Sequence, residues 1–254
     1  MTHILAFHAH PDDVETLGAG TLALLAANGH RITIATMTAG DCGAIDTSRE
    51  ETARIRKAEA AAAAAMIGAD YRCAEIPDLA VFNDDATRRA TAELIRKVGP
   101  GIVITGSPAD YHPDHEATSI LVRDACFAST VRNYATGPAA PLDHIPHLYF
   151  MDPIEGRDRD GKRVPADFGV DVTAHFATRR AMLEVHKSQH RWVEKQHGES
   201  DYTQSMERFA AKRGKHFGVR YAEGFRQYTG TPYPRSQVLQ ELVSGALRMP
   251  PATA

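Results

Sequence analysis

Short runs of apolar and β-branched residues alternate with segments of helical periodicity along the first 151 residues of the chain. The runs that predict strands are residues 3–9, 32–36, 71–76, 102–105 and 147–151. The segments that predict helices are residues 14–28, 48–66, 87–98 and 115–128. Such alternation is typical of βαβ units. It predicts an α/β fold, a Rossmann-like three-layer sandwich with a mainly parallel sheet, whose active site lies at the C-terminal ends of the strands.

The composition changes after Pro153, where charged residues and glycine become frequent. This part predicts an exposed loop or hairpin at residues 155–162, one further strand at 168–172, and helices at 174–196 and 201–213. We expect a single domain over residues 1–254. Residues 1–152 would form its α/β core, residues 153–249 would add helices and loops that frame the pocket, and residues 250–254 would be a frayed tail.

Bulk properties exclude several classes of protein. The chain has 254 residues, is 43% hydrophobic and carries a net charge of -3, so it lacks the basic surface expected of a nucleic-acid or membrane-surface partner. Its 3 cysteines are odd in number and show no CxxC pattern, which argues against a disulfide framework or a cysteine zinc site. We find no signal peptide and no apolar stretch long enough to span a membrane. A cytoplasmic location is expected.

Two similar polar stretches each follow a predicted strand: His10-Pro11-Asp12-Asp13 and His112-Pro113-Asp114-His115. Proline has no amide hydrogen to donate within a sheet, so Pro11 ends its strand and begins a loop. Taken alone, the first stretch is equally compatible with a turn that caps a helix. The second stretch changes that balance, because the C-terminal ends of parallel strands lie along one edge of a sheet. We therefore expect both stretches at the same edge.

These stretches contain a set of metal-binding residue types. His10 and Asp13 flank a strand-to-helix turn, and His115 can supply a third ligand from the second loop. Two histidines and one carboxylate leave a position for water, which is the pattern of a catalytic zinc site. Zinc lowers the pKa of such a water toward ~7. We expect one Zn²⁺ per chain, with Fe²⁺ as the alternative because it accepts the same ligands.

The remaining polar groups of the two stretches are candidates for proton transfer. Asp12 can act as a general base that takes a proton from the attacking water. His112 can stabilise an oxyanion or protonate a leaving amine, and Asp114 can orient an imidazole.

Together, residues 9–13 and 112–115 resemble the signature pair of motifs of the LmbE/PIG-L superfamily. Weaker similarities lie at residues 55–59 with the alanine-rich helix, at residues 77–78 and at residues 186–189. Members of this superfamily are zinc-dependent deacetylases of N-acetylglucosaminyl compounds. The resemblance implies the metal ligands and proton-transfer residues given above, and it places Arg56 and Asp78 near the substrate.

The chain departs from the superfamily pattern at two positions. Many members have glutamate directly after the aspartate pair, where this chain has Val14 followed by Glu15. In some members a tyrosine that assists the oxyanion lies two residues before the first histidine of the second motif. Here that position is Asp110, and Tyr111 is next to His112.

Four residues are candidates for substrate binding: Arg56, Asp78, Tyr111 and His186. Three of them have a plainer interpretation that the sequence leaves open. Arg56 could be a solvated helix residue paired with a nearby glutamate, Asp78 could be a turn residue after Pro77, and His186 could be structural.

The function expected from the resemblance is removal of an acetyl group from an N-acetylated amino sugar or its conjugate, by zinc hydroxide with Asp12 as base. A small acetylated sugar conjugate would be the partner, and self-association into a homo-oligomer is expected from the resemblance alone. The alternative is a zinc-dependent hydratase of the oxalomesaconate type, which adds water to an unsaturated oxo-acid. The third interpretation is a non-enzymatic protein that binds a metal or a ligand. The presence of Asp12, the candidate general base, argues against it.

Overall fold

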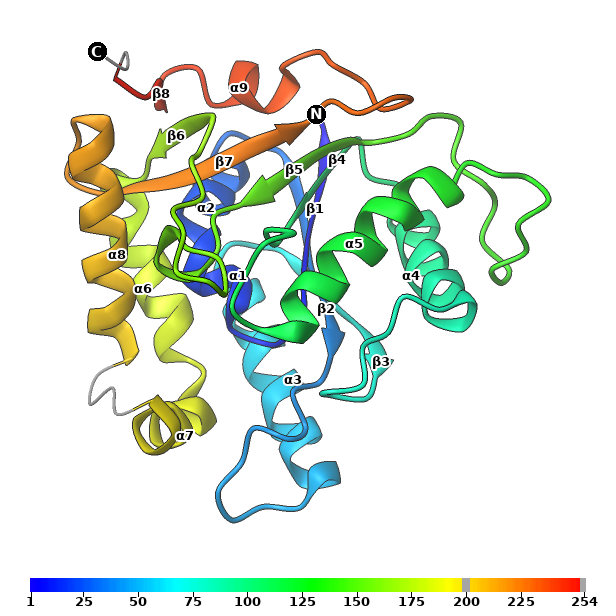
Figure 1. The fold of residues 1–254 in the computed structure, drawn as a ribbon, viewed down its shortest axis with the longest axis horizontal. Coiled ribbons are helices and arrows are strands. Elements are labelled where there is room, and N and C mark those ends of the chain that lie inside the picture. Colours follow the sequence, from blue (N-terminus) through cyan, green and yellow to red (C-terminus); the bar gives the residue numbers. More distant parts are fainter. Residues whose placement is uncertain (198–201, 252–254) are drawn as a thin grey trace.

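One mixed sheet runs through the molecule, and helices cover both of its faces (Figure 1). The computed structural model describes residues 1–197 and 202–251. The strands are β1 His3–His8, β2 Arg31–Thr38, β3 Asp70–Ile76, β4 Ile102–Thr105, β5 His147–Met151, β6 Phe168–Asp171, β7 Ala222–Tyr228 and β8 Leu247–Arg248. The α-helices are α1 Asp13–Leu17, α2 Ala19–Ala27, α3 Arg49–Ala65, α4 Asp85–Val98, α5 Pro113–Ala128, α6 Phe176–Glu184, α7 Lys187–His197, α8 Tyr202–Phe217 and α9 Val238–Leu242. Two 3₁₀ turns, η1 Ile154–Gly156 and η2 Thr173–His175, complete the described elements.

The expectation of a mainly parallel sheet is wrong. The strand order is β3-β2-β1-β4-β5-β7-β6-β8. The five strands from β3 to β5 run parallel, as the sequence predicts, but β7, β6 and β8 add antiparallel pairings beyond β5. The part after Pro153 therefore contributes three strands to the sheet, of which the sequence analysis predicts only β6.

Two of the predicted helices are interrupted in the structure. Residues 14–28 form α1 and α2, which meet at Gly18, where an added Cβ would lie only 2.7 Å from the Met151 sulfur of β5. Residues 174–196 form η2, α6 and α7, with a break at His186. Residue 201 of the helix predicted at 201–213, and residues 252–254 of the predicted tail, lie outside the described residues.

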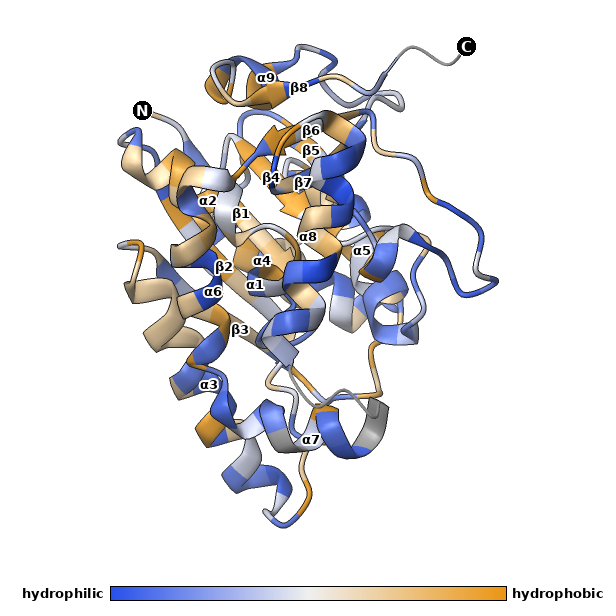
Figure 2. Ribbon diagram, turned by 90° about the vertical axis from the view of Figure 1, so that its left-hand side faces the viewer, coloured by the Kyte–Doolittle hydropathy of each residue, from blue (hydrophilic) through white to orange (hydrophobic). Residues whose placement is uncertain are grey.

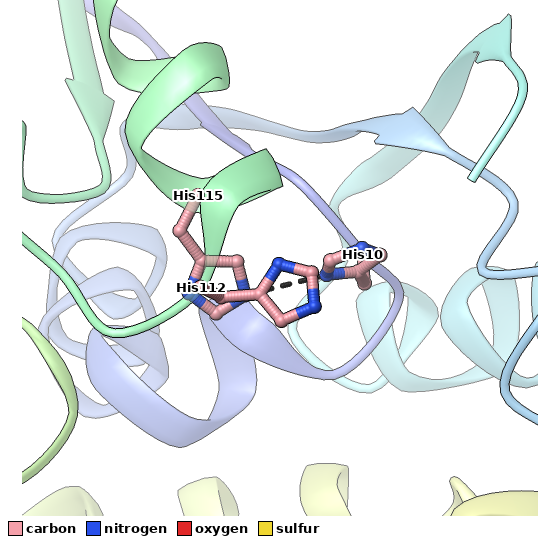
Figure 3. Close-up of side chains that lie close together, drawn as sticks. All are labelled: His10, His112 and His115. Atoms are coloured by element: carbon pink, nitrogen blue, oxygen red, sulfur yellow. Dashed lines mark hydrogen bonds between the residues drawn. The ribbon is translucent and has the colours of Figure 1, made fainter. Parts of the chain in front are cut away.

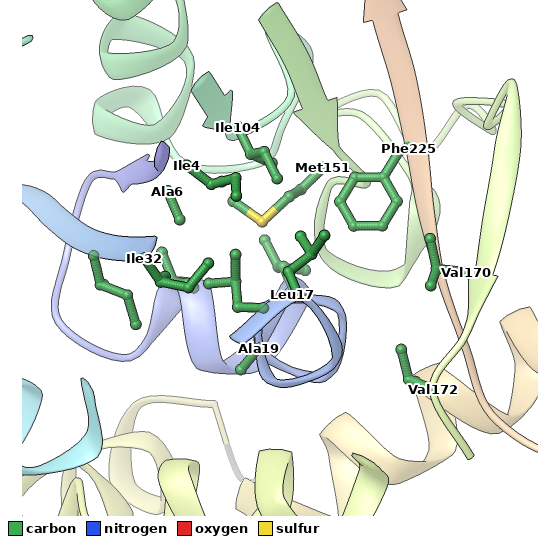
Figure 4. Close-up of a cluster of buried hydrophobic side chains, with 14 of the residues drawn as sticks. Ile4, Ala6, Leu17, Ala19, Ile32, Ile104, Met151, Val170, Val172 and Phe225 are labelled. Atoms are coloured by element: carbon green, nitrogen blue, oxygen red, sulfur yellow. The ribbon is translucent and has the colours of Figure 1, made fainter. Parts of the chain in front are cut away.

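The central strands bury both of their faces. Along β1, Ile4 and Ala6 belong to one hydrophobic cluster with α1, α2 and α6, whereas Leu5 and Phe7 belong to another with α4 and α5. This alternation follows from the two-residue period of a strand. Figure 4 shows the first cluster, and Figure 2 shows the apolar strands inside the more hydrophilic surface of helices such as α8.

The register between β1 and β4 brings the two polar stretches together. Phe7 pairs with Thr105, so the loops that follow the two strands leave the sheet side by side. The expectation that residues 10–13 and 112–115 share one edge is confirmed.

A buried ion pair ties the C-terminal strands to the first helices. The Glu223 carboxylate of β7 accepts hydrogen bonds from the amides of Gly20 (2.9 Å) and Thr21 (2.8 Å) at the start of α2. The Arg179 guanidinium of α6 lies 3.2 Å from the same carboxylate, and it also donates to carbonyls of Glu15 and Thr16 in α1. Both charged side chains are 1% exposed. The position of α1 therefore depends on this pair.

Within residues 1–197 and 202–251, no helix has the length and apolar character needed to cross a lipid bilayer.

Replacing one partner of the buried Glu223–Arg179 ion pair tests whether the pair holds α1. Glu223→Gln would leave the Arg179 charge buried without its carboxylate, so we expect the free energy of unfolding to fall by about 3–5 kcal/mol. Urea denaturation monitored by circular dichroism would measure it. The matched control is Glu184→Gln, which removes the same group from an exposed ion pair with Arg180 and should change little. Equal, small effects of both variants would show that the buried pair does not hold α1.

Candidate metal centre

The turn between β1 and α1 has an unusual backbone. Asp12 lies in the left-handed region (φ 100°), which residues other than glycine rarely adopt. Arg56 holds this turn, because its guanidinium donates to the carbonyls of Pro11 (2.7 Å) and Gly40 (2.9 Å). An added Cβ on Gly40 would lie 2.3 Å from that guanidinium, so the close passage of Arg56 requires glycine there.

The second polar stretch forms the N-terminus of α5. His112 is the N-cap residue, and its Nδ1 accepts a hydrogen bond from the amide of Asp114 (3.1 Å). Pro113 follows at the start of the helix, where its missing amide hydrogen leaves no hydrogen bond unmade. His115 lies in the first turn and is 3% exposed. The turn thus directs His112 and His115 toward His10 of the first stretch (Figure 3).

Three side chains bring potential ligand atoms together. His10 Nδ1 lies 3.3 Å from His115 Nε2 and 3.4 Å from Asp13 Oδ2, and His115 Nε2 lies 3.3 Å from Asp13 Oδ1. Ligands bound tetrahedrally at about 2.0–2.1 Å are themselves about 3.3 Å apart. His10 and His115 approach different oxygens of Asp13, so the carboxylate lies within reach of a zinc-sized cation between the two imidazoles. Fe²⁺ accepts the same donor set.

Each of these ligand groups is held from behind by another side chain. His10 Nε2 lies 3.1 Å from Asp78 Oδ1, and His115 Nδ1 lies 3.0 Å from Asp110 Oδ1. His8 Nδ1 lies 2.7 Å from Asp13 Oδ2. Such outer hydrogen bonds fix the orientation of metal-binding histidines and raise their basicity.

Charges in the cluster compensate one another. Burial alone would raise the pKa of Asp13, but His115 and His8 outweigh it and hold that pKa well below its usual range. Burial likewise disfavours a charged His115, yet Asp13 and Asp110 outweigh it and raise the pKa of His115 to about 9. A divalent cation that replaces these protons would interact with the same carboxylates.

Asp12 lies beside the ligands and is 7% exposed. Burial raises the pKa of Asp12, and the negative charge of Asp13 raises it further. Arg56 acts in the opposite direction, because its Nη2 lies 3.5 Å from Asp12 Oδ2. The Tyr202 hydroxyl of α8 also hydrogen-bonds to the Asp12 carboxylate. A carboxylate with a raised pKa is suited to accept a proton and release it again.

The rim of the site is formed by His112 and Tyr111. The His112 ring stacks on His115 with centroids 4.8 Å apart and meets His10 edge-on at 4.9 Å. Burial and the charges of His115 and His10 lower its pKa. Tyr111 is 48% exposed. A nitrogen of His112 also lies within 4.8 Å of ligand atoms of His10 and His115, so the geometry permits it as a further ligand.

Two of the predicted substrate contacts are buried beneath the site. Arg56 is 4% exposed and pairs with Asp12. It is therefore not the solvated helix residue, paired with a glutamate, that the plainer interpretation of the sequence describes. Asp78 accepts a hydrogen bond from the amide of Cys42 (3.0 Å) in addition to its contact with His10. Both therefore have partners within the protein.

Asp114 and His186 also lie away from the open face. The Asp114 carboxylate accepts from the amide of Leu79 (2.8 Å) and lies 3.5 Å from His10 Nε2, so the imidazole that it faces is that of His10. His186 is 0% exposed, with Nε2 3.4 Å from Glu15 Oε1.

Sequence analysis does not identify three side chains that shape this cluster: His8, Asp110 and Tyr202. His8 is the last residue of a buried strand, two positions before His10, and that placement of a polar residue was a usable signal. Asp110 marks a departure from the superfamily pattern, and the structure shows that it holds His115. Nothing local distinguishes Tyr202, which reaches Asp12 from a helix about 190 residues further along the chain.

Comparison with known proteins agrees with this geometry. Residues 5–126, which include both polar stretches, match the family model described as PIG-L, GlcNAc-PI de-N-acetylase. This match spans just under half of the chain. The relatives and structural neighbours of the chain are deacetylases and hydratases, so the protein is an enzyme.

The relatives differ in activity. A 4-oxalmesaconate hydratase of Pseudomonas putida is 24% identical over 74% of this chain and 74% of its own length. A 1D-myo-inositol 2-acetamido-2-deoxy-alpha-D-glucopyranoside deacetylase of Actinosynnema mirum is 26% identical over 73% of this chain and 80% of its own. The solved N,N'-diacetylchitobiose deacetylase of Pyrococcus horikoshii has the same fold, with TM-score 0.77 and 23% identity over 93% of this chain and 88% of that one. Similarity to these proteins alone therefore does not distinguish a deacetylase from a hydratase.

Removing a ligand and removing its support should weaken metal binding to different degrees. Asp78→Asn removes the negative charge behind His10 and leaves every candidate ligand in place, so we expect a metal affinity about 10–100-fold lower. His115→Ala removes a ligand and should cost more. Competition with a chromophoric chelator would measure both affinities. The control is His144→Ala, which removes an exposed loop histidine. Wild-type affinity in His115→Ala would contradict the ligand assignment.

Proposed function

We propose that this enzyme is a zinc-dependent deacetylase that removes an acetyl group from an N-acetylated amino sugar or its conjugate. The observation that carries the proposal is the convergence of His10, Asp13 and His115, whose nitrogen and carboxylate oxygen atoms lie 3.3–3.4 Å apart, with the Asp12 carboxylate beside them. The match to the PIG-L family model supports it, as do the deacetylases among the relatives.

The proposed chemistry divides between the metal and the chain. When bound, zinc would lower the pKa of a water molecule and polarise the acetamide carbonyl. Asp12 takes the proton of the attacking water, since its pKa is raised by burial. Arg56 and Tyr202 fix the Asp12 carboxylate through its other contacts, so that it keeps one orientation throughout the transfer.

His112 is placed to act on the opposite side of the scissile bond. Its pKa is lowered, so the neutral imidazole predominates at neutral pH and can receive a proton before passing it to the leaving amine. Its backbone position is fixed, because its amide donates to Asp110 Oδ1 (3.1 Å) and its Nδ1 caps α5. Nε2 is then the nitrogen available to the substrate.

The charge around the metal supports a neutral substrate group over a polycarboxylate. Carboxylates of Asp78, Asp110 and Asp114 surround the histidines. The guanidinium of Arg56 is engaged by two carbonyls and by Asp12. A tricarboxylate of the hydratase type would meet mainly negative charge there, whereas an acetamide would not. The hydratase remains the alternative because a relative with that activity is 24% identical to this chain.

The role of Asp12 is tested by Asp12→Asn. Asparagine tolerates the left-handed backbone but cannot take a proton, so we expect bound metal to be retained and kcat to fall about 10²–10⁴-fold. Steady-state kinetics together with metal analysis would measure this. Asp143→Asn, in an exposed loop, serves as the control. Unchanged turnover in Asp12→Asn would remove Asp12 as the base.

The reaction itself is tested by acetate release from a panel of N-acetylglucosamine conjugates. Metal-free protein should release no acetate, and the same protein reloaded with zinc should release one acetate per substrate consumed. Unsaturated oxo-acids would be assayed in parallel by loss of ultraviolet absorbance. Hydration of an oxo-acid without acetate release from any conjugate, in protein that carries one zinc per chain, would replace the deacetylase proposal with the hydratase.

A further inference from the structure

A cavity of about 340 Å³ lies between the loop that follows β5 and helix α8, and none of its lining residues is a candidate metal ligand. The loop contributes residues 155–157 and 163–165, and α8 contributes residues 209, 212, 213 and 216. Its volume falls in the range of small-molecule sites.

Positive charge dominates the lining. Arg157, Arg163, Lys212 and Arg213 contribute four cations, against one carboxylate from Glu155. These charges converge: burial first, then Arg213 and Arg163, lower the pKa of His216, which also lines the cavity.

The cations differ in how they are already paired. Arg213 is fixed by Asp152, whose Oδ2 lies 2.6 Å from Arg213 Nε. Arg157 donates to the carbonyl of Gly161 within its own loop. Across residues 1–197 and 202–251, neither Arg163 nor Lys212 has a carboxylate within ion-pair distance. Two cations of the lining, Arg163 and Lys212, therefore have no ion-pair partner in the described part of the chain.

We propose that this cavity binds a small molecule that carries a phosphate or carboxylate group. Arg163 and Lys212 supply charge-assisted hydrogen bonds to the anion, and Arg213 is held rigid beside them. The rings of Phe209 and Pro165 with the side chain of Val164 form an apolar wall for the rest of the ligand. This site goes beyond the proposed deacetylation, which needs no anion.

The loop of the cavity also contacts α5, the helix that carries His115. Arg159 pairs with Glu116 of α5, Glu116 Oε1 accepts from the amide of Asp110 (3.1 Å), and Asp110 holds His115. The bound anion can therefore have two sources: a charged group on the substrate itself, or a separate small molecule.

Isothermal titration of zinc-loaded protein with inorganic phosphate and with citrate tests the site. We expect saturable binding that is about 10–100-fold weaker in Arg163→Gln and in Lys212→Gln, because each loses a hydrogen bond to a charged group. Lys215→Gln, on the exposed side of the same helix, removes the same charge outside the cavity and should bind like wild type. As a local readout, bound phosphate should raise the pKa of His216 in a proton NMR titration. Absence of saturable binding, or equal loss in Lys215→Gln, would overturn the proposal.

A kinetic experiment distinguishes an anion carried by the substrate from a separate anionic molecule. It depends on the proposed deacetylation. If the substrate supplies the anion, Arg163→Gln should raise KM for N-acetylglucosamine 6-phosphate but not for N-acetylglucosamine, and phosphate should compete with the former. If a separate molecule binds, phosphate should bind without that competition. Should neither sugar be deacetylated, the binding titration still decides whether the anion site exists.

Discussion

The parallel pairing of β1 with β4 determines where the chemistry of this chain lies. It joins loops whose histidines, His10 and His115, are 105 residues apart in sequence but 3.3 Å apart in space. A shift of one residue would turn Leu5 and Phe7 toward the wrong helices, because the two faces of β1 pack in separate clusters. The same apolar packing that stabilises the sheet therefore keeps the two ligand loops in register.

Holding so many buried charges together opposes folding unless each is paired. Asp78 and Asp110 each contact an imidazole, and Arg56 contacts Asp12. The Glu223–Arg179 pair on the far side of α1 fixes the helix that carries Asp13. A bound divalent cation would stabilise the folded state further, because these ligands are assembled only there. Metal binding and stability are linked through the position of α1.

The sequence predicts those features that depend on neighbouring residues. The five parallel strands follow from local apolar runs, and both ligand loops follow from proline after a strand. Strand β7 is different: Glu223 and Gly224 interrupt its apolar pattern, and both positions make sense only beside α2 and Asp152. The contact of Tyr202 with Asp12 likewise arises from tertiary packing, so no local pattern reveals it.

Charge divides the molecule into two unlike regions. Aspartates surround His10 and His115, whereas Arg163 and Lys212 line the cavity beside α8 without carboxylate partners among the described residues. The second region attracts an anionic group, while a neutral acetamide is indifferent to it. For a ligand that carries both groups, this pattern favours the orientation with the acetamide at the metal. If the substrate is a neutral sugar, the cavity remains available to a separate anionic molecule. The Arg159–Glu116 contact connects the two regions in either case.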